Sequence, residues 1–432
     1  MQKNMFFLKE QDLPTQWLNI KSVLPDKLPP LKEPNDDRGS RLDVIKKIRT
    51  KAMLDQDGTE EKWVDIPGEV LDKYIQVGRS TPLMRAIELE QYLDTPAKIY
   101  IKREDFLPTH SFKLNTAIPQ AYYAKNENVK GLISETGAGQ WGLGLSYACN
   151  MFNIEAIVFW VRISMEQKPF RKYWSEMLGG KIYPSPSKLT SSGRILLEKD
   201  PNSYGSLGTA IGDAISYTLE NEEYKYASGS NLNHVLLHQS IIGLETYRQL
   251  EIAGDMPDTV IACCGGGSNL GGIMAPFIQA KVENPSNIKL LAVESNASPR
   301  LSKGEYKYDF SDPLGITPLT LSYTMGHDFM PPSSHVGGLR QHNGSPMVGM
   351  LRNKGILDAV SYDQEEIFEA GRLFTKLYGS IPAPETCHAI KATIDEALSA
   401  KVNNEKKTIL MCFSGNGLLD LNGYIESSDK KR

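Results

Sequence analysis

The sequence predicts an α/β protein with two doubly wound domains, in which helices cover both faces of parallel sheets. From about residue 96 onward, short apolar segments of strand length alternate with helical segments, a pattern typical of such sheets. Two glycine-rich turns each follow an apolar strand and open a helix. This alternation of strands and helices occurs in two blocks separated near residue 240, so we expect domains over 1–240 and 241–432 with a cleft between them.

The first block contains four predicted strands and three predicted helices. Alternating and apolar patterns indicate strands at 97–105, 129–136, 154–161 and 181–186. Helical patterns cover 115–127, 140–152 and 165–180. Pro119 falls inside the first of these helices, where it should lie near the first turn or kink the helix.

The second block repeats this order, with predicted strands at 259–264, 288–294 and 406–413 and helices at 265–283 and 365–379. Residues 300–360 are richer in Gly, Ser, Pro and His, so we expect loops to dominate there. Residues 1–40 are rich in proline and charge, so we expect them to wrap over a core rather than form one.

Composition excludes several classes of function. The 432 residues carry a net charge of -4 and show no polybasic run, which argues against nucleic-acid and membrane-surface partners. The first residues lack the apolar core of a signal peptide, and the longest apolar runs are far shorter than a membrane span. The five cysteines are scattered, so we expect them reduced and buried, in a cytoplasmic protein without a metal site.

The turn "CGGGSNLGG", residues 264–272, is the first candidate for ligand binding. Its glycines let backbone N–H groups converge at a helix N-terminus, which suits one phosphate, and Ser268 and Asn269 add donors. It matches neither the nucleotide P-loop nor the dinucleotide motif. The alternative interpretation is a tight strand-to-helix turn without a ligand.

The turn "SETGAGQWG", residues 134–142, has the same placement between a strand and a helix. The backbone donors from Thr136 to Gly139 suit a small anion such as a carboxylate. Glu135 lies at the mouth of this loop, either as a catalytic acid or base or as an ordinary capping or surface acid.

Lys113 in "PTHSFKLNTA" follows an irregular turn and opens a helix. A cation is disfavoured at a helix N-terminus, and this position helps to lower the pKa of an amine that forms a Schiff base. Taken alone, the stretch also fits a surface lysine. Together, a phosphate turn, a carboxylate loop and this lysine are the parts of a pyridoxal-phosphate enzyme.

At this point the chain resembles the tryptophan synthase β chains from about residue 78 to its end. The motifs that carry the resemblance, in family order, are "GRSTPL" (78–83), "KRED" (102–105), "SFKLN" (111–115), "ETGAGQWG" (135–142), "CGGGSN" (264–269), "IPAPETCHAI" (381–390) and "SGNG" (414–417). The extended N-terminus and Trp141, where classical chains have histidine, resemble the divergent second group. The resemblance implies fold type II, a cofactor in the interdomain cleft and a mobile subdomain over about 128–215.

The resemblance also implies roles for individual residues. Lys113 would form the Schiff base, Ser414 would face the pyridine nitrogen, and Glu135 would be the acid or base at the incoming nucleophile. Cofactor-binding residues would be Lys113, Asn115, Ser230, Gly265, Gly266, Gly267, Ser268, Asn269, Glu385 and Ser414. The substrate would be bound by Thr136, Gly137, Ala138, Gly139, Gln140 and Arg340.

The implied activity is a β-replacement that joins indole to L-serine or O-phospho-L-serine and gives L-tryptophan, the last step of its biosynthesis. A serine or threonine dehydratase, threonine synthase or cysteine synthase shares the fold, but such enzymes do not need Glu135. A rival of another class is a non-catalytic protein that binds a phosphorylated metabolite. The family further implies a homodimer, and a monovalent cation and a tryptophan synthase α subunit are additional candidates.

Two positions depart from the family pattern. Phe112 stands where a histidine usually precedes the lysine, so a contact with the cofactor phosphate is in question. Arg340 stands where classical chains have an aspartate that binds the serine hydroxyl. Because an arginine fork suits a phosphate, O-phospho-L-serine becomes a candidate donor. The alternative is a structural arginine paired with a carboxylate.

The segment 165–180 resembles the part of the mobile subdomain that contacts the α subunit in classical enzymes. Phe170, Tyr173, Trp174 and Met177 are spaced for one face of a helix. We expect this face to join the core, and the alternative is a surface for a partner.

Overall fold

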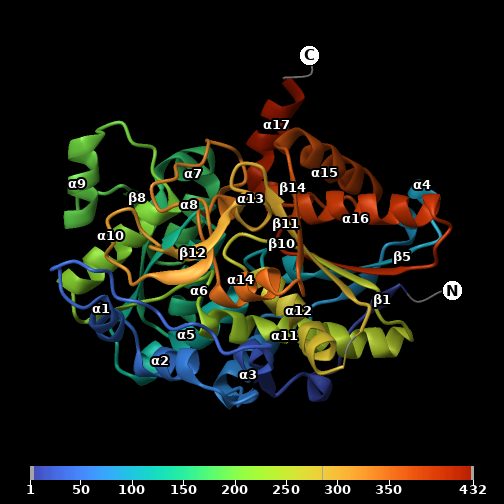
Figure 1. Ribbon diagram of the computed structural model, residues 1–432, viewed down its shortest axis with the longest axis horizontal. Helices are drawn as coiled ribbons and strands as arrows, with labels where there is room; N and C mark the ends of the chain where they lie inside the picture. The colour runs from blue at the N-terminus through green and yellow to red at the C-terminus, as the bar shows by residue number, and fades with distance from the viewer. Residues whose placement is uncertain (1–3, 285, 430–432) are drawn as a thin grey trace.

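The computed structural model describes residues 4–284 and 286–429, so the outermost residues of both predicted domains lie outside the described part. Two sheets form its framework, one of seven strands and one of four, and helices surround both (Figure 1). These sheets confirm the predicted α/β class with helix-covered parallel strands. Two further pairs of short strands are antiparallel: β2 (Gln16–Leu18) with β3 (Trp63–Asp65), and β12 (Glu305–Asp309) with β13 (Thr320–Thr324).

The four-stranded sheet lies within the first half of the chain, and all its strands are parallel. Its order is β8 (Gly180–Ser185), β7 (Glu155–Val161), β6 (Gly131–Thr136) and β9 (Tyr224–Tyr226). Every residue of β6 is buried, which fits a central strand covered on both faces. The helices α6 (Gln140–Met151) and α10 (Leu207–Glu220) pack on β6 and β7.

The seven-stranded sheet combines strands from both halves of the chain. Its order is β1 (Met5–Phe6), β4 (Leu83–Arg85), β5 (Lys98–Arg103), β15 (Thr408–Phe413), β10 (Thr259–Cys263), β11 (Lys289–Ser295) and β14 (Asp358–Tyr362). Because β5 precedes residue 240 and pairs with β15, while β4 pairs with β5, the predicted boundary does not separate the two sheets. The division of the chain into domains stays a prediction.

Helices cover the seven-stranded sheet on two sides. Figure 1 shows α15 (Gln364–Tyr378) and α16 (Pro384–Val402) on one side, with α11 (Asn233–Ala253) and α12 (Ser268–Glu283) on the other. The remaining helices are α1 (Arg41–Ile48), α2 (Lys51–Gly58), α3 (Gly68–Gln76), α4 (Ile87–Leu93), α5 (Leu114–Asn126), α7 (Arg162–Gln167), α8 (Pro169–Met177), α9 (Ser191–Lys199), α13 (Arg300–Lys303), α14 (Pro346–Asn353) and α17 (Leu421–Asp429).

The predicted helix over 165–180 is two helices, α7 and α8. Pro169 causes the break, because it lacks a backbone N–H and fits only the first turn of a new helix. The expectation that one face of this segment joins the core is wrong for three of its four residues, while Trp174 is partly buried, with its ring centroid 5.6 Å from that of His110. Phe170, Tyr173 and Met177 are 74%, 65% and 70% exposed.

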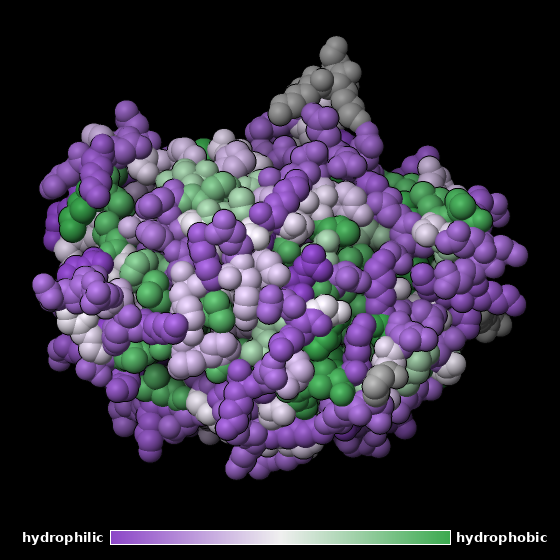
Figure 2. All heavy atoms as spheres, in the orientation of Figure 1, coloured by the Kyte–Doolittle hydropathy of each residue, from purple (hydrophilic) through white to green (hydrophobic). Residues whose placement is uncertain are grey.

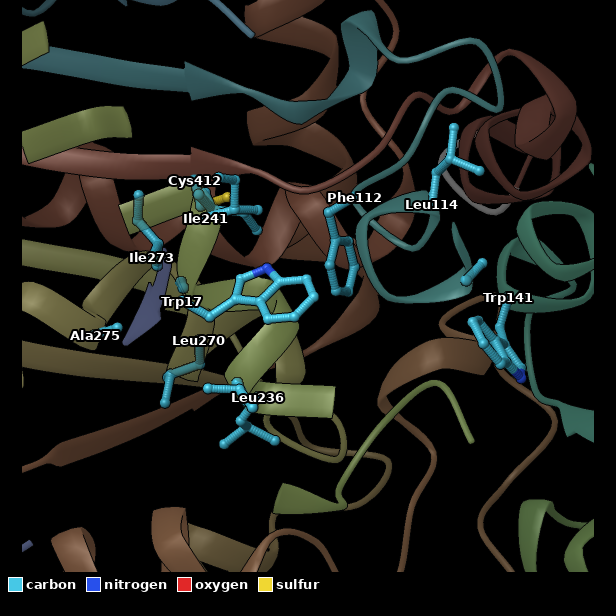
Figure 3. Packing of buried hydrophobic residues seen from close by; sticks show 14 of the residues in the cluster. Trp17, Phe112, Leu114, Trp141, Leu236, Ile241, Leu270, Ile273, Ala275 and Cys412 are labelled. Carbon is cyan, nitrogen blue, oxygen red and sulfur yellow. The ribbon is translucent and has the colours of Figure 1, made fainter. Parts of the chain in front are cut away.

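Other local expectations also need correction. Pro119 lies inside α5 rather than in its first turn. Residues 300–360 are mostly loop, as expected, but they also hold the β12–β13 hairpin and α14. The N-terminal segment does more than wrap the core, because Trp17 is fully buried within it, 4.6 Å from the His238 ring between centroids. Figure 3 shows Trp17 among side chains of the central core, with Phe112 nearby.

The surface carries mostly polar side chains. Figure 2 shows a largely hydrophilic face on which hydrophobic residues occur in small groups. Within the described ranges, none of the helices combines the length and the apolar character that crossing a bilayer requires. All five cysteines are free and buried, as predicted.

Candidate active site

One cavity brings together most of the predicted site residues, from both sheets and from the loops at the carboxyl ends of their strands. Fourteen of them line it: Lys113, Glu135, Thr136, Gly137, Ala138, Gln140, Ser230, Gly265, Gly266, Gly267, Ser268, Asn269, Glu385 and Ser414. Asn115, Gly139 and Arg340 do not belong to this lining. Ligands of open α/β sheets bind at this edge, outside the carboxyl ends of the strands.

Lys113 is the N-cap residue directly before α5, and it is partly buried. Its Nζ donates hydrogen bonds to the Gly229 carbonyl and, at 3.3 Å, to Ser268 Oγ in the glycine-rich turn. Burial lowers the pKa of Lys113 to about 8, although Glu135 opposes this shift. The amine is therefore partly neutral near physiological pH, as a nucleophilic lysine requires.

Phe112 places its ring 4.7 Å from Lys113 Nζ, measured to the ring centroid. The ring can stabilise the ammonium form through its π face but has no donor for a phosphate. Gln341 and Ser230 line the same cavity, and both lie against Gly266 of the glycine-rich turn. These two polar side chains are available where the usual histidine is missing.

Glu135 is the penultimate residue of β6, and its side chain is buried. The Tyr226 hydroxyl donates a hydrogen bond of 2.7 Å to its Oε2. Burial raises the pKa of Glu135 to about 7, even though this hydrogen bond and Lys113 favour the carboxylate. A carboxyl group with this pKa can both accept and return a proton near neutral pH.

The glycine-rich turn between β10 and α12 forms a cradle that only glycine permits. A Cβ on Gly265 would overlap the Gly338 carbonyl, and a Cβ on Gly266 would lie 2.8 Å from Gln341 Oε1. Gly267 has a φ of +114° and is the N-cap residue directly before α12. Asn269 Oδ1 is buried without a hydrogen-bond partner among the described residues. The backbone cradle and the helix N-terminus fit a phosphate group.

The predicted carboxylate loop is equally constrained. A Cβ on Gly137 would lie 2.7 Å from the Gly337 carbonyl, so glycine lets two backbones approach closely. Gly139 has a φ of +91°, and a side chain there would collide with Trp160. The Gly139 N–H is already used, because it donates to Thr136 Oγ1 at 3.2 Å. The cavity side of the loop, with Gly137, Ala138 and Gln140, remains available to an anion at the N-terminus of α6.

Ser414, which directly follows β15, and Glu385, in the first turn of α16, both line the cavity. Ser414 Oγ lies 2.8 Å from Thr386 Oγ1 and 3.4 Å from Cys263 Sγ, so its partners are neutral. Glu385 Oε1 accepts a hydrogen bond of 2.8 Å from the Gly338 N–H. Its Oε2 is buried and has no hydrogen-bond partner in the described chain.

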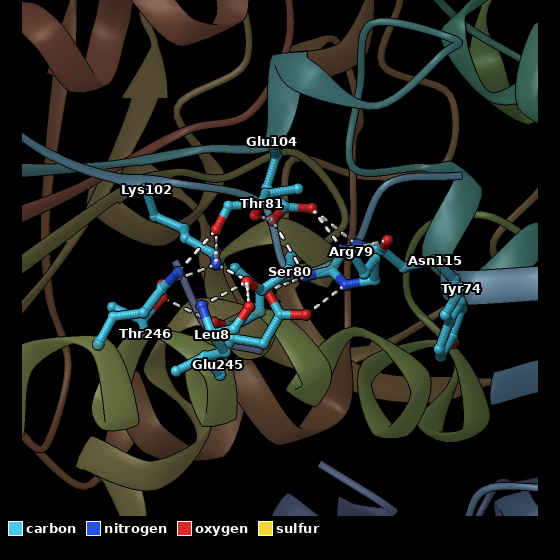
Figure 4. Close-up of polar contacts among 12 residues, drawn as sticks. Leu8, Tyr74, Arg79, Ser80, Thr81, Lys102, Glu104, Asn115, Glu245 and Thr246 are labelled. Carbon is cyan, nitrogen blue, oxygen red and sulfur yellow. Dashed lines mark hydrogen bonds and ion pairs between the residues drawn. The ribbon is translucent and has the colours of Figure 1, made fainter. Parts of the chain in front are cut away.

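Asn115 lies behind Lys113, in a buried network of charged groups (Figure 4). Its Oδ1 accepts from Arg79 at 2.5 Å, and its Nδ2 donates to Glu104 Oε2 at 2.8 Å. Arg79 also pairs with Glu245 at 2.7 Å, and these charged side chains are fully buried. The network fixes the first turn of α5, while a contact between Asn115 and the cofactor stays a prediction.

Arg340 is 4% exposed and lies beside the cavity, between the lining residues Leu339 and Gln341. Its guanidinium donates to the Pro332 carbonyl at 3.1 Å and to Ser164 Oγ at 3.3 Å. Its Nε has no hydrogen-bond partner, and it forms no ion pair with a carboxylate in the part of the chain that the structure describes. The alternative of a carboxylate-paired arginine is therefore absent there.

Sequence reasoning missed several residues of the cavity, namely Trp141, Leu207, Gly229, Cys263, Gly337, Gly338, Leu339 and Gln341. The run "VGGLRQ" could have indicated the second glycine pair. Trp141 donates from Nε1 to Ser134 Oγ at 2.7 Å, which holds its ring beside Glu135 in the lining. Lys168 was also missed. It is 2% exposed, and its Nζ lies 3.5 Å from Asp420 without a hydrogen-bond partner among described atoms.

Comparisons with known proteins show the family of the chain. The family model "Pyridoxal-phosphate dependent enzyme" matches residues 75–415. The chain is 50% identical over 421 residues to "Tryptophan synthase beta chain 2" of Methanothermobacter thermautotrophicus, covering 98% of both chains. It is 47% identical over 418 residues to the protein of the same name from Thermotoga maritima, covering 97% of this chain and 99% of that one.

A solved structure shares the fold at low identity. Threonine deaminase isoform 2 from Solanum lycopersicum superimposes with a TM-score of 0.60 and 18% identity, covering 96% of each chain. The fold is thus that of fold type II pyridoxal-phosphate enzymes, as predicted. The chain belongs to the pyridoxal-phosphate dependent enzyme family and, within it, to the tryptophan synthase beta chains of the second type.

Proposed function

We propose that this lyase joins indole to the β-carbon of L-serine or O-phospho-L-serine and releases L-tryptophan. The observation that carries the proposal is that Lys113 and Glu135 line one cavity with pKa values near 8 and 7. When bound, pyridoxal phosphate supplies an electron-withdrawing ring that stabilises charge at the α-carbon of an amino acid. Lys113 and the turn 265–269 would hold it, with Ser230 and Gln341 beside its phosphate.

Lys113 and Glu135 divide the proton transfers between them. Lys113 Nζ, once free, removes the α-proton of the donor amino acid, and its lowered pKa keeps it partly neutral for this task. Glu135 takes the proton that indole loses after its carbon attacks the β-carbon. Burial favours this role, since the raised pKa lets the carboxylate bind a proton near pH 7.

The remaining cavity residues orient the substrates. The loop 136–140 would bind the donor carboxylate with backbone donors at the N-terminus of α6. Ser414 would face the pyridine nitrogen as a neutral hydroxyl and leave it unprotonated, so the ring is a weaker electron sink. This favours loss of the β-substituent over transamination.

An excess of buried positive charge supports O-phospho-L-serine as the donor. Lys168 Nζ and Arg340 Nε have no hydrogen-bond partner among the described residues, while Arg171 already binds Asp420 at 2.7 Å. Burial lowers the pKa of Lys168, the charges of Asp420 and Glu385 raise it, and those of Arg171 and Arg340 lower it further, so four charged groups act on this lysine. Three cations face two carboxylates in this cluster. A phosphate leaving group would restore the balance.

The donor is tested by steady-state kinetics with indole and either L-serine or O-phospho-L-serine, for the unmodified enzyme, Arg340→Ala and Arg194→Ala. Arg194, which is largely exposed and hydrogen-bonded to the Lys188 carbonyl, is the matched control. We expect Arg340→Ala to reduce kcat/KM for O-phospho-L-serine at least tenfold more than for L-serine. Equal losses with both donors, or preferred use of L-serine by the unmodified enzyme, would contradict this assignment.

The rival activity is that of a dehydratase with the same fold. It is tested by measuring pyruvate formation from the donor in the absence of indole. The proposed function predicts slow formation of pyruvate from the donor and a large excess of tryptophan formation once indole is present. Rapid pyruvate formation that indole does not suppress would favour the dehydratase.

The exposed face of α8 supports a tryptophan synthase α subunit as a partner. Phe170, Tyr173 and Met177 project together from this helix, a typical surface for binding another protein. Co-elution of the two chains, lost in Phe170→Asp, is the test. A homodimer, a cytoplasmic location and a monovalent-cation requirement remain predictions.

A further inference from the structure

A second groove lies between the N-terminal helices and the body of the protein. Its walls come from α1, α2, the segment before α1, the start of α11, the loop after β12 and the start of α14. Apolar side chains form most of its lining, among them Leu28, Leu31, Leu42, Ile45, Leu54 and Leu232. It shares no lining residue with the cavity of Lys113.

The groove also carries positive charge. Lys21, Lys46 and Arg49 line it, against the single carboxylate of Asp57. Lys21 pairs with Glu60 at 2.8 Å and Lys46 pairs with Asp43 at 3.2 Å, so both are already engaged outside the lining.

Arg49 is the cation with unused capacity. It is 9% exposed and pairs with Asp57 at 2.7 Å through Nη1, but its Nε has no hydrogen-bond partner in the described chain. A buried donor without a partner costs free energy, which a ligand that accepts a hydrogen bond would recover. An apolar wall beside such an arginine fits a molecule with an apolar body and one anionic group.

One loop separates this groove from the active site. Gly229 and Ser230 line the active-site cavity, whereas Asn231, Leu232 and Asn233 line the groove. The Gly229 carbonyl accepts the hydrogen bond from Lys113 Nζ. A ligand that shifts Leu232 would therefore act three residues away from a direct partner of the reactive lysine.

The groove side of this loop is also anchored. Asp57 Oδ1 accepts hydrogen bonds from the backbone N–H of His234 at 2.7 Å and from its Nδ1 at 2.8 Å. Arg49, Asp57 and His234 thus form a chain of contacts from the groove to the first turn of α11. An anion bound to Arg49 would compete with Asp57 for the Arg49 guanidinium.

We propose that the groove is a binding site for a small molecule with an apolar body and one carboxylate or similar anion, and that its occupancy changes the environment of Lys113. The inference goes beyond the proposed function and does not depend on which amino acid is the donor. Its readouts are binding at the groove and the absorbance of the cofactor-loaded enzyme.

The test titrates the cofactor-loaded enzyme with 5-phenylpentanoate by calorimetry and repeats the titration with neutral 5-phenylpentan-1-ol. We expect the acid to bind at least tenfold more tightly than the alcohol. Arg49→Gln should remove this preference, and Leu31→Asp should weaken binding of the acid at least tenfold. Leu31 is 39% exposed, so this change is compatible with folding.

Val402→Asp is the matched control, since Val402 is 84% exposed and lies outside both cavities. It should bind the acid like the unmodified enzyme. Saturation with 5-phenylpentanoate should shift the cofactor absorbance in the unmodified enzyme and in Val402→Asp, but not in Leu31→Asp. Equal binding of acid and alcohol, or undiminished binding to a folded Leu31→Asp, would overturn the site. Binding without any change in absorbance would overturn the link to Lys113.

Discussion

The Tyr226 hydroxyl donates a 2.7 Å hydrogen bond to Glu135 Oε2, and both side chains are buried. Tyr226 belongs to β9 and Glu135 to the neighbouring β6, so the contact depends on their pairing in the four-stranded sheet. The bond favours the carboxylate, and burial favours the neutral acid more strongly. The balance places the pKa of Glu135 at about 7, where one side chain can exchange protons with indole.

Tyr226→Phe should move the pH dependence of tryptophan formation. Removing the hydrogen bond removes a contribution that lowers the pKa of Glu135, so this pKa should rise further. The basic form of Glu135 then appears only at higher pH, and the rising limb of the kcat profile should shift upward. Tyr224→Phe is the control, because Tyr224 on the same strand bonds Glu155 instead. Identical profiles for both variants would contradict the role of Tyr226.

Glu135→Gln should reduce tryptophan formation about 10²- to 10⁴-fold, the usual contribution of a positioned acid or base. The loss of the β-substituent from the donor should persist, since Lys113 removes the α-proton. The two steps are separated by measuring pyruvate without indole and tryptophan with indole. Equal loss of both products would show that the glutamate supports the site generally rather than serving indole.

The same variant should become more stable than the unmodified protein as pH rises. The pKa of Glu135 is about 7 when folded and 4.5 as an isolated group, so the unfolded state ionises first. Between these values the folded state binds more protons, and raising the pH destabilises it. Glutamine does not titrate, so its advantage should grow from near zero below pH 4.5 to about 3 kcal/mol above pH 7. Urea unfolding at pH 5 and pH 8 measures this difference.

Arg79→Met should strongly destabilise the fold. It would leave the fully buried Glu104 and Glu245 with less compensation, and breaking a buried ion pair in this way costs about 3–5 kcal/mol. Arg85→Met is the matched control, since Arg85 pairs with Glu90 in a partly exposed position and should cost about 0–1 kcal/mol. Thermal unfolding measures the melting temperatures of both variants, and equal values would contradict a stabilising role for the buried network.

Much of the site could be predicted because its parts are local. The cradle 265–269 and the loop 135–140 are contiguous turns between a strand and a helix, so glycine spacing and helix N-termini identify them. Lys113 is recognisable only together with them. Asn115 was harder to place, because its partners Arg79, Glu104 and Gln239 are distant in the chain.

The wrong or missing expectations share one physical origin, which is contact between segments that are distant in the sequence. Helical spacing shows that Phe170, Tyr173 and Met177 share a face, but not whether another element covers it. Strand patterns likewise do not specify which strands pair. The addition of β4 and β5 to the sheet of β10 and β15 follows from long-range packing that no local motif reports. The groove at Arg49 also assembles from separate segments and has no contiguous signature.

The central claim is that Lys113 and Glu135 serve one reaction that makes tryptophan from indole and a serine-type donor. The most direct test is tryptophan formation from indole by the purified, cofactor-loaded enzyme, its Lys113→Ala variant and its Glu135→Gln variant. The account predicts turnover with L-serine or O-phospho-L-serine, no turnover after Lys113→Ala, and a 10²- to 10⁴-fold loss after Glu135→Gln. Tryptophan formation that persists without Lys113, or its absence in the unmodified enzyme with both donors, would contradict the account.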